Sequence, residues 1–245
     1  MHAFYLEGKG AVGELAPLPK DEAKHALKVL RLGVGDEICA MDKAGGRFAA
    51  VIEEIGGDAA SVRLAQALPS NEPPVRLTLY QGLPKSDKLY FIVQKLTELG
   101  AARLVPVKME RSVVKLNDRD GQKKQERLQK IAREAAKQCK RGGCLEVTAP
   151  QTWKQLRESM AAHDLLLVPW EDARGFGLKA ARAAFPEAKD VGIVIGPEGG
   201  MSENEVRALE ELGAKQITLG PRILRTETAA IAAATMAMLL WGDIG

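Results

Sequence analysis

The feature that most constrains the fold is an alternation of apolar runs with helical runs that begins near residue 75. The short runs are rich in Leu, Val and Ile, and in the stretches between them apolar residues recur with the helical period. This alternation predicts an α/β domain over 75–245, with a mostly parallel sheet and helices on both of its faces. The expected strands span 75–83, 103–107, 145–150, 164–169, 191–196 and 216–220. The expected helices span about 86–99, 122–140, 152–161, 176–184, 202–212 and 226–241.

Residues 1–70 follow a different pattern, made of short extended runs and tight turns. Two extended runs flank the Gly45–Gly46 pair and a third follows Gly57, while apolar residues at helical spacing predict one short helix over about 20–32. A small β-barrel fits this pattern best. The segment 69–74, PSNEPP, separates the two domains, because its adjacent prolines suit neither a helix nor a strand.

Composition describes an ordinary folded protein. Hydrophobic residues make up 46% of the chain and charged residues 27%, which supplies ample material for a core. No apolar run approaches the roughly 18 residues of a membrane span, and the start, MHAFYLEGKG, lacks the basic-then-apolar order of a signal peptide. We therefore expect a cytoplasmic protein that does not enter a membrane.

Cysteine usage gives little sign of metal or redox chemistry. Cys39, Cys139 and Cys144 cannot all pair, and none has a metal-ligand spacing with histidine. The spacing of Cys139 and Cys144 admits a redox or metal site, but two small buried thiols are the preferred interpretation. We expect no bound metal.

The distribution of charge is more informative than the net charge of +3. Between Arg103 and Arg141 there are thirteen Lys or Arg residues against five Asp or Glu, so this segment alone carries more than the whole net charge. The helix expected over 122–140 has an apolar stripe, and its basic residues fall elsewhere on its surface. Such a face is usually only solvated, and contact with a nucleic acid is the alternative interpretation.

Three loops follow strands of the expected sheet, at the end where parallel sheets bind their ligands. They are PWEDARGFG (169–177), GPEGGMSENEV (196–206) and GPRILRTETAA (220–230). Glycines in the second loop allow backbone to approach a ligand closely, and Ser202 with Glu205 forms a capping box for the next helix. The chain has no P-loop lysine motif and no GxGxxG after the first strand of the α/β region, which argues against nucleotide hydrolases and Rossmann enzymes. One pocket of another geometry is expected.

The strings IGPEGGMSENEV (195–206) and LGPRILRTETAA (219–230) resemble the two C-terminal motifs of the trefoil-knot methyltransferases. Specifically, they resemble the family that methylates N3 of a uridine in 16S ribosomal RNA. The resemblance extends to HALKVLRLGVGDEI (25–38), KLTELGAARLVPV (95–107) and REAAKQCKR (133–141), and so covers most of the chain. It implies a PUA-like N-terminal barrel that binds RNA, and a knotted domain that binds S-adenosylmethionine and works as a homodimer.

The resemblance also nominates site residues. In the family the cofactor is bent and held mostly by backbone groups of the knot loops. Carried over to this chain, the cofactor contacts are Val168, Pro169, Ile195, Gly196, Pro197, Glu198, Gly199, Leu219, Gly220, Ile223 and Leu224. Plain core packing is the alternative role for Ile195, Leu219 and Leu224.

Methylation at uridine N3 needs a base or a cation, because the N3 proton is only weakly acidic at neutral pH. Arg225 is expected to stabilise negative charge on the pyrimidine, since an arginine is too basic for ordinary proton abstraction. Glu98 and Glu198 are the candidate bases, although Glu98 could equally be structural. The expected RNA contacts are His25, Arg31, Lys85, Lys88, Arg111, Arg133 and Arg141. His25 could instead be a packed core residue.

The sequence is also compatible with three other functions. The same fold could methylate another RNA, for example at a ribose hydroxyl of transfer RNA. The chain could also be a non-catalytic RNA-binding or ribosome-assembly protein, against which the intact GPEGG and ILRTETA loops argue. A metabolite-binding α/β protein would not need the basic segment.

Overall fold

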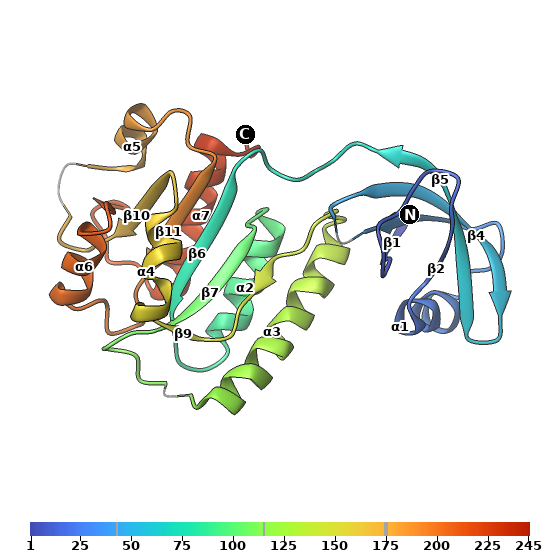
Figure 1. The fold of residues 1–245 in the computed structure, drawn as a ribbon, viewed down its shortest axis with the longest axis horizontal. Coiled ribbons are helices and arrows are strands. Elements are labelled where there is room, and N and C mark those ends of the chain that lie inside the picture. The colour runs from blue at the N-terminus through green and yellow to red at the C-terminus, as the bar shows by residue number, and fades with distance from the viewer. Residues whose placement is uncertain (43, 115, 174–175) are drawn as a thin grey trace. The chain divides into compact units, whose positions relative to one another are not determined.

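The computed structural model describes residues 1–42, 44–114, 116–173 and 176–245, so Lys115 of the basic segment and Arg174 and Gly175 of the 169–177 loop lie outside the described residues. The chain forms two compact units (Figure 1). Unit 1 contains Met1–Glu72 and Glu134–Cys144, and unit 2 contains Pro73–Arg133 and Leu145–Gly245. The segment 134–144, which the strand and helix pattern assigns to the α/β domain, therefore packs with the N-terminal residues.

Unit 1 is built on a five-stranded sheet with strand order β1-β3-β4-β5-β2. Its strands are β1 (His2–Tyr5), β2 (Leu15–Pro17), β3 (Glu37–Met41), β4 (Arg47–Gly56) and β5 (Ala59–Leu68). β1 pairs in parallel with β3, and the other pairs are antiparallel. The three expected extended runs are β3, β4 and β5. Among the described residues no ladder joins β1 to β2, so these two are the edge strands of the sheet.

The predicted turn at Gly45–Gly46 lies between β3 and β4 and depends on Asp42. The buried carboxylate of Asp42 accepts hydrogen bonds from the N–H groups of Gly46 at 2.8 Å, Ala44 at 2.9 Å and Gly10 at 3.0 Å. Gly45 has φ +88°, a conformation that side chains strongly disfavour. The turn therefore needs both a carboxylate and a glycine.

The one short helix predicted in unit 1 is present as two consecutive pieces. α1 (Lys20–Lys24) continues directly into η1 (His25–Val29), a π-helical turn. Arg31, two residues after it, has a positive φ of +57°. Single π-helical turns are rare and occur frequently at functional sites.

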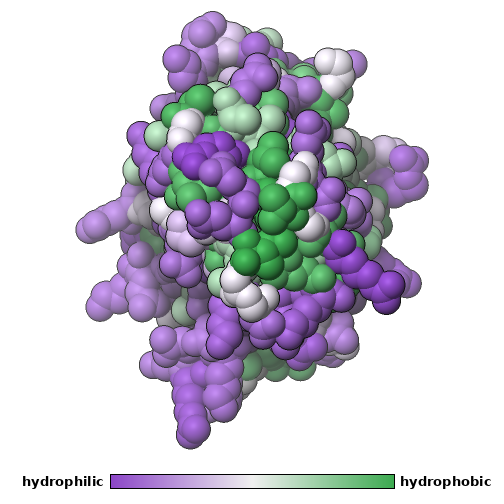
Figure 2. All heavy atoms as spheres, turned by 90° about the vertical axis from the view of Figure 1, so that its right-hand side faces the viewer, coloured by the Kyte–Doolittle hydropathy of each residue, from purple (hydrophilic) through white to green (hydrophobic). Residues whose placement is uncertain are grey.

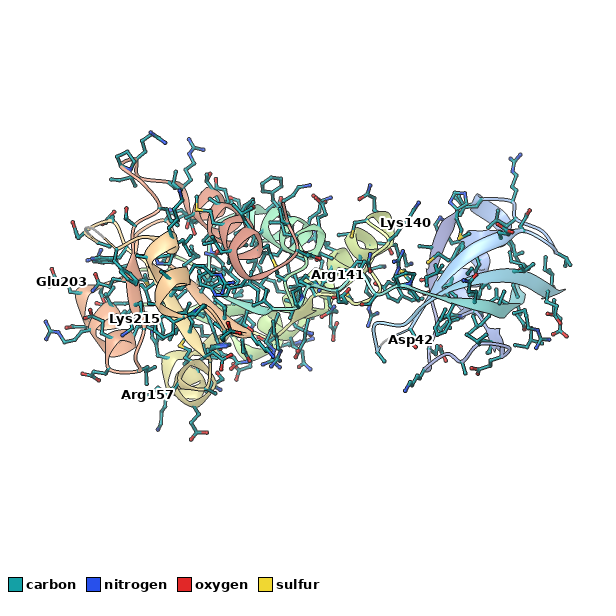
Figure 3. The ribbon with its side chains drawn as sticks, turned by 90° about the horizontal axis from the view of Figure 1, so that it is seen from above. Asp42, Lys140, Arg141, Arg157, Glu203 and Lys215 are labelled. Carbon is teal, nitrogen blue, oxygen red and sulfur yellow. The ribbon has the colours of Figure 1, made fainter. Side chains whose placement is uncertain are left out.

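A buried ion pair fixes the segment 134–144 within unit 1. Arg141 is 5% exposed, and its Nη2 lies 2.7 Å from the carboxylate of Glu72. The hydroxyl of Tyr5 donates to the carbonyl oxygens of Arg141 at 3.2 Å and Gly143 at 3.0 Å. Burial raises the pKa of Tyr5, so this hydroxyl stays protonated. Figure 3 shows Arg141 next to Lys140 at the end of the long helix.

Figure 2 faces unit 1 and shows apolar side chains gathered among polar ones. The large apolar side chains of unit 1 that remain exposed are Met1, Val12, Val29, Val34 and Ile55. The core beneath is fully buried at Phe4, Ile38 and Leu64.

Unit 2 is an α/β structure in which every paired strand is parallel to its neighbour, in the order β12-β10-β11-β6-β7-β8, with β9 paired to β7. Its strands are β6 (Arg76–Gly82), β7 (Arg103–Lys108), β8 (Glu146–Val147), β9 (Gln151–Thr152), β10 (Leu165–Pro169), β11 (Asp190–Ile195) and β12 (Lys215–Ile217). The prediction of a mostly parallel sheet is confirmed.

Helices cover both faces of this sheet (Figure 1). They are α2 (Lys88–Glu98), α3 (Asp118–Gln138), α4 (Trp153–Ala161), α5 (Leu178–Ala184), α6 (Glu203–Glu210) and α7 (Thr226–Trp241). α7 packs on α2, α5 and the strands β6 and β11. On the other face, apolar residues of α4 and α6 share a core with Tyr80, Val168 and Val194. Within the described residues no helix is long and apolar enough to cross a membrane.

The close packing at the end of β6 requires a glycine, Gly82. A β-carbon at Gly82 would lie 2.5 Å from Cδ of Pro197 and 2.7 Å from the sulfur of Met109. We expect Gly82→Ala to lower the free energy of unfolding by about 1–3 kcal/mol, because the loop after β11 would have to move. Urea-induced unfolding measures this loss.

Gly177→Ala is the matched control in unit 2. Its added methyl group would meet only the carbonyl oxygen of Thr218, at 3.9 Å. The free energy of unfolding should therefore change by less than about 0.5 kcal/mol. Equal effects of the two substitutions would contradict the close approach at Gly82.

Candidate functional site

A cavity of about 480 Å³ opens at the carboxyl ends of β10, β11 and β12. This is the end at which open parallel sheets bind their ligands. The loops after the three strands and the first turns of α2 and α7 supply its walls. The lining residues are Lys88, Pro169, Trp170, Glu171, Ile195, Gly196, Pro197, Glu198, Gly200, Met201, Thr218, Leu219, Gly220, Pro221, Arg222, Ile223, Leu224, Arg225, Thr226 and Ala229.

The cavity brings together most of the residues nominated as cofactor contacts. Those that line it are Pro169, Ile195, Gly196, Pro197, Glu198, Leu219, Gly220, Ile223 and Leu224. Two nominated residues do not line it, because Val168 is fully buried in the core of unit 2 and Gly199 is exposed beside Arg111. The Ile223 side chain is 84% exposed at the cavity.

A buried hydrogen-bond network joins the ends of two strands to the start of α7. The hydroxyl of Thr226 donates to the carbonyl oxygen of Gly196 at 2.6 Å and accepts from Nε2 of Gln81 at 2.9 Å. Gln81 Nε2 also donates to the carbonyl oxygen of Gly82 at 2.9 Å. Gln81 is fully buried and Thr226 is 6% exposed, so these bonds are shielded from water.

A second network is ionic. The Lys88 ammonium lies 3.1 Å from Glu198 and 3.0 Å from Glu227, and the backbone N–H of Lys85 donates to the Glu198 carboxylate at 3.1 Å. Burial tends to raise the pKa of both carboxyls, but hydrogen bonds from their own backbone N–H groups and from Lys88 outweigh it and lower both pKa values. The same bonds raise the pKa of Lys88, so it stays protonated.

The predicted capping box at the start of α6 is confirmed. Ser202 Oγ accepts from the N–H of Glu205 at 3.3 Å, and the Glu205 carboxylate accepts from the N–H of Ser202 at 2.9 Å. Glu205 also accepts from the N–H of Glu110 at 2.8 Å and from the indole of Trp153 at 2.7 Å. This one carboxylate therefore holds the loop after β7 and helix α4 beside the loop that forms the cavity.

The three candidate catalytic residues have different positions. Arg225 is exposed, lines the cavity and is the N-cap residue of α7. Glu198 also lines the cavity, with a lowered pKa that makes it a weak base. Glu98 lies outside the cavity at the end of α2, where its carboxylate pairs with Lys95 at 2.9 Å. The geometry therefore favours the structural role for Glu98.

Four of the nominated RNA contacts lie in unit 2. Arg111 is exposed and donates to the carbonyl oxygen of Gly199 at 3.2 Å, next to the cavity. Lys85 is exposed in the loop after β6, and Arg133 is exposed on α3. Lys88 lines the cavity and is engaged by two carboxylates.

The other three lie in unit 1. Arg31 is exposed after the π-helical turn. His25 is half-buried, and its ring meets that of Phe4 edge-on with centroids 6.0 Å apart, which matches its alternative role as a packing residue. Arg141 is buried in its ion pair with Glu72, so the structure assigns it a structural task instead of leaving its guanidinium open to phosphate.

Sequence reasoning missed several residues of the site. Gln81 organises the cavity from the end of an apolar strand, and a polar residue in such a run is the signal that could have found it. Arg222 and Thr226 lie inside a recognised motif but had no assigned role. Trp170, Met201 and Thr218 become wall residues only through the packing of separate loops. The part of the chain that the structure describes holds no group of three or more His, Cys, Asp or Glu side chains placed to bind a metal ion.

Comparison with known families agrees with this architecture. A family model described as an RNA methyltransferase domain matches residues 71–238, and one described as an RNA methyltransferase PUA domain matches residues 18–65. These two matches define the class: an α/β RNA methyltransferase domain preceded by a PUA domain of RNA methyltransferases.

Curated relatives narrow the class further. The ribosomal RNA small subunit methyltransferase E of Bacillus subtilis is 36% identical over 237 residues, which cover 94% of this chain and 93% of the relative. The protein of the same name from Aquifex aeolicus is 32% identical, with 97% of this chain and 99% of the relative covered. This chain belongs to the ribosomal RNA small subunit methyltransferase E family.

Solved structures are similar over their whole length. A methyltransferase from Legionella pneumophila, solved with bound S-adenosylmethionine, has a TM-score of 0.85 at 31% identity, covering 98% of both chains. A ribosomal RNA small subunit methyltransferase E from Neisseria gonorrhoeae, also bound to S-adenosyl methionine, has a TM-score of 0.82 at 29% identity, covering all of both chains.

The contribution of the Thr226 hydroxyl to stability can be tested separately from the volume of the side chain. Thr226→Val keeps the shape but leaves the Gly196 carbonyl and the Gln81 amide without this partner, so it should lower the free energy of unfolding by about 1–3 kcal/mol. Thr226→Ser keeps the hydroxyl and should lose less than about 1 kcal/mol. Chemical denaturation compares the two, and a valine variant as stable as the serine variant would rule out the network as a source of stability.

Proposed function

We propose that this protein transfers a methyl group from S-adenosylmethionine to N3 of a uridine in 16S ribosomal RNA. The observation that carries the proposal is the cavity, because the two motif loops, at 195–206 and 219–230, meet there at the carboxyl ends of the parallel strands. The whole-length similarity to two proteins solved with this cofactor supports the same ligand here.

The residues of the cavity suit a cofactor with a flat heteroaromatic ring and several polar groups. Its volume of about 480 Å³ falls in the usual range for small-molecule sites. Ile195, Leu219 and Leu224 offer apolar walls, while Gly196 and Gly220, which have no side chains, allow a bound cofactor to approach the backbone closely. When bound there, S-adenosylmethionine supplies the activated methyl group. Val168 and Gly199 stay predicted contacts through their backbone groups.

The charges at the cavity favour an electrostatic mechanism. Loss of the N3 proton leaves negative charge on the uracil ring, and Arg225 at the cavity wall can stabilise it. Glu198 and Glu227 have lowered pKa values, so both are poor acceptors for a weakly acidic proton. The N3 proton is therefore proposed to pass to water, and the protein's contribution is to position the reactants and to lower the energy of the uracil anion.

The RNA is proposed to reach the cavity along basic side chains. Arg111 and Lys85 are exposed near the loop after β11, and Arg133 is exposed on α3. Arg31 extends the same assignment to unit 1, whose match to a PUA domain of RNA methyltransferases supports it, and His25 stays a predicted contact beside its packing on Phe4. Phosphate contacts of this kind supply affinity without sequence information.

We also propose that this protein has the knot, the domain boundary and the cytoplasmic location expected from its family. A trefoil knot would thread the chain through the loops that the Thr226 hydroxyl holds together. The domains would divide near residues 70–75, and the protein would act in the cytoplasm, where its substrate is assembled.

A homodimer is proposed through the outer surface of α2 and α7. These helices pack on each other and expose Phe91 at 48%, Met236 at 37% and Leu239 at 58%. Exposed apolar surface of this kind is typical of an interface. Sedimentation should give the mass of two chains, and Leu239→Glu should shift the protein toward the monomer. A wild-type monomer at micromolar concentration would contradict the dimer.

Arg225 gives the sharpest test of the chemistry. Arg225→Gln should lower kcat for methyl transfer by about 10²–10³-fold, because it removes a charge that acts on the developing anion. The dissociation constant for S-adenosylmethionine, measured by calorimetry, should change less than about threefold. Arg157→Gln, at an exposed position on α4 (Figure 3), is the matched control and should leave both quantities unchanged. An Arg225→Gln variant with full kcat would remove arginine from the mechanism.

A further inference from the structure

We propose that Lys88 is a positioning residue for methyl transfer, which fixes the two motif loops around the cofactor instead of binding RNA phosphate. This inference rests on the proposed function, since it concerns the same cavity.

Lys88 lies where three segments of unit 2 meet. It belongs to the first turn of α2, Glu198 to the loop after β11 and Glu227 to the first turn of α7. Its ammonium group is within 3.1 Å of a carboxylate oxygen of each glutamate. One side chain therefore cross-links the two motif loops to the helix that follows β6.

The partners of Lys88 leave its charge fully compensated. Two carboxylates share one ammonium, so the group of three carries a net charge of −1. A phosphate approaching Lys88 would meet both carboxylates, and the resulting repulsion opposes an RNA contact. Lys85, three residues earlier, is the better phosphate ligand, because its side chain is exposed and only its backbone N–H bonds to Glu198.

Partial burial gives the contact more weight than an ordinary surface pair. The side chains of Lys88 and Glu198 are each 29% exposed, and that of Glu227 is 18% exposed. Isolated exposed pairs contribute little, whereas a network of three partly exposed groups with short distances restrains its members more strongly.

Loss of the Lys88 contacts would affect the residues next to the two glutamates. Glu198 follows Gly196 and Pro197, which line the cavity, and Glu227 follows Arg225 and Thr226. Without Lys88 the two carboxylates would repel each other across the cavity wall. The backbone that binds the cofactor and the arginine that faces the uracil would then lose their alignment.

The experiment compares Lys88→Met with Lys88→Arg in the full-length protein. Lys88→Met should raise the dissociation constant for S-adenosylmethionine about tenfold and lower kcat, while KM for ribosomal RNA changes less than about twofold. Lys88→Arg keeps the charge and both possible partners, so it should recover most of the affinity for the cofactor.

Lys95→Met is the matched control on the same helix. Lys95 has a similar side-chain exposure of 32% and pairs with Glu98 outside the cavity. It should leave cofactor binding and kcat unchanged. A general loss of helix stability would lower the melting temperatures of Lys88→Met and Lys95→Met equally. It would not produce the expected difference in cofactor affinity between them.

A double-mutant cycle guards against a folding defect in any one variant. Glu227→Gln removes one partner of Lys88, and the double variant with Lys88→Met should bind the cofactor no worse than Lys88→Met alone. Additive losses would overturn the proposed cross-link. Normal cofactor binding by Lys88→Met together with a raised KM for RNA would also overturn it, because Lys88 would then be a phosphate contact.

The proposed function fails separately. Wild-type protein that bound the cofactor but methylated no RNA would contradict the proposed function, while the difference in cofactor binding between the variants would still stand.

Discussion

The hydrogen bond from the Thr226 hydroxyl to the Gly196 carbonyl is the contact on which the site depends. Loops alone do not form a pocket, because each has many conformations of similar energy. Here the bond joins the loop after β11 to the start of α7, and Gln81 ties both to the end of β6. A shielded bond of 2.6 Å, with Gln81 as a second donor to the same hydroxyl, favours one arrangement of the segments that line the cavity.

The two networks around the cavity have different tasks. The neutral network of Gln81 and Thr226 is buried and sets the backbone, while the ionic network of Lys88 is partly exposed and sets the outer wall. Preorganisation of this kind reduces the entropy that binding must overcome. Arg225, which we propose to stabilise the uracil anion, lines the same cavity.

The order of elements in unit 2 was predictable because each strand and helix carries its own pattern of apolar residues. The capping box of Ser202 and Glu205 was predictable for the same reason, since its signal is local. Contacts between distant residues were not. The ion pair of Arg141 with Glu72 lies within unit 1, which also includes the last residues of α3. Neither segment carries a local sequence pattern that predicts this pairing. The role of Gln81 likewise exists only through a residue 145 positions away.

The most direct test of the account is transfer of isotopically labelled methyl from S-adenosylmethionine to small ribosomal subunits that lack their own modifications. Nucleoside mass spectrometry of the digested RNA should find the label in 3-methyluridine and in the 16S chain. Label in a ribose-methylated nucleoside would contradict the uracil chemistry assigned to Arg225 while leaving the cofactor site in place. No label in any RNA, from protein that binds the cofactor, would contradict catalysis itself.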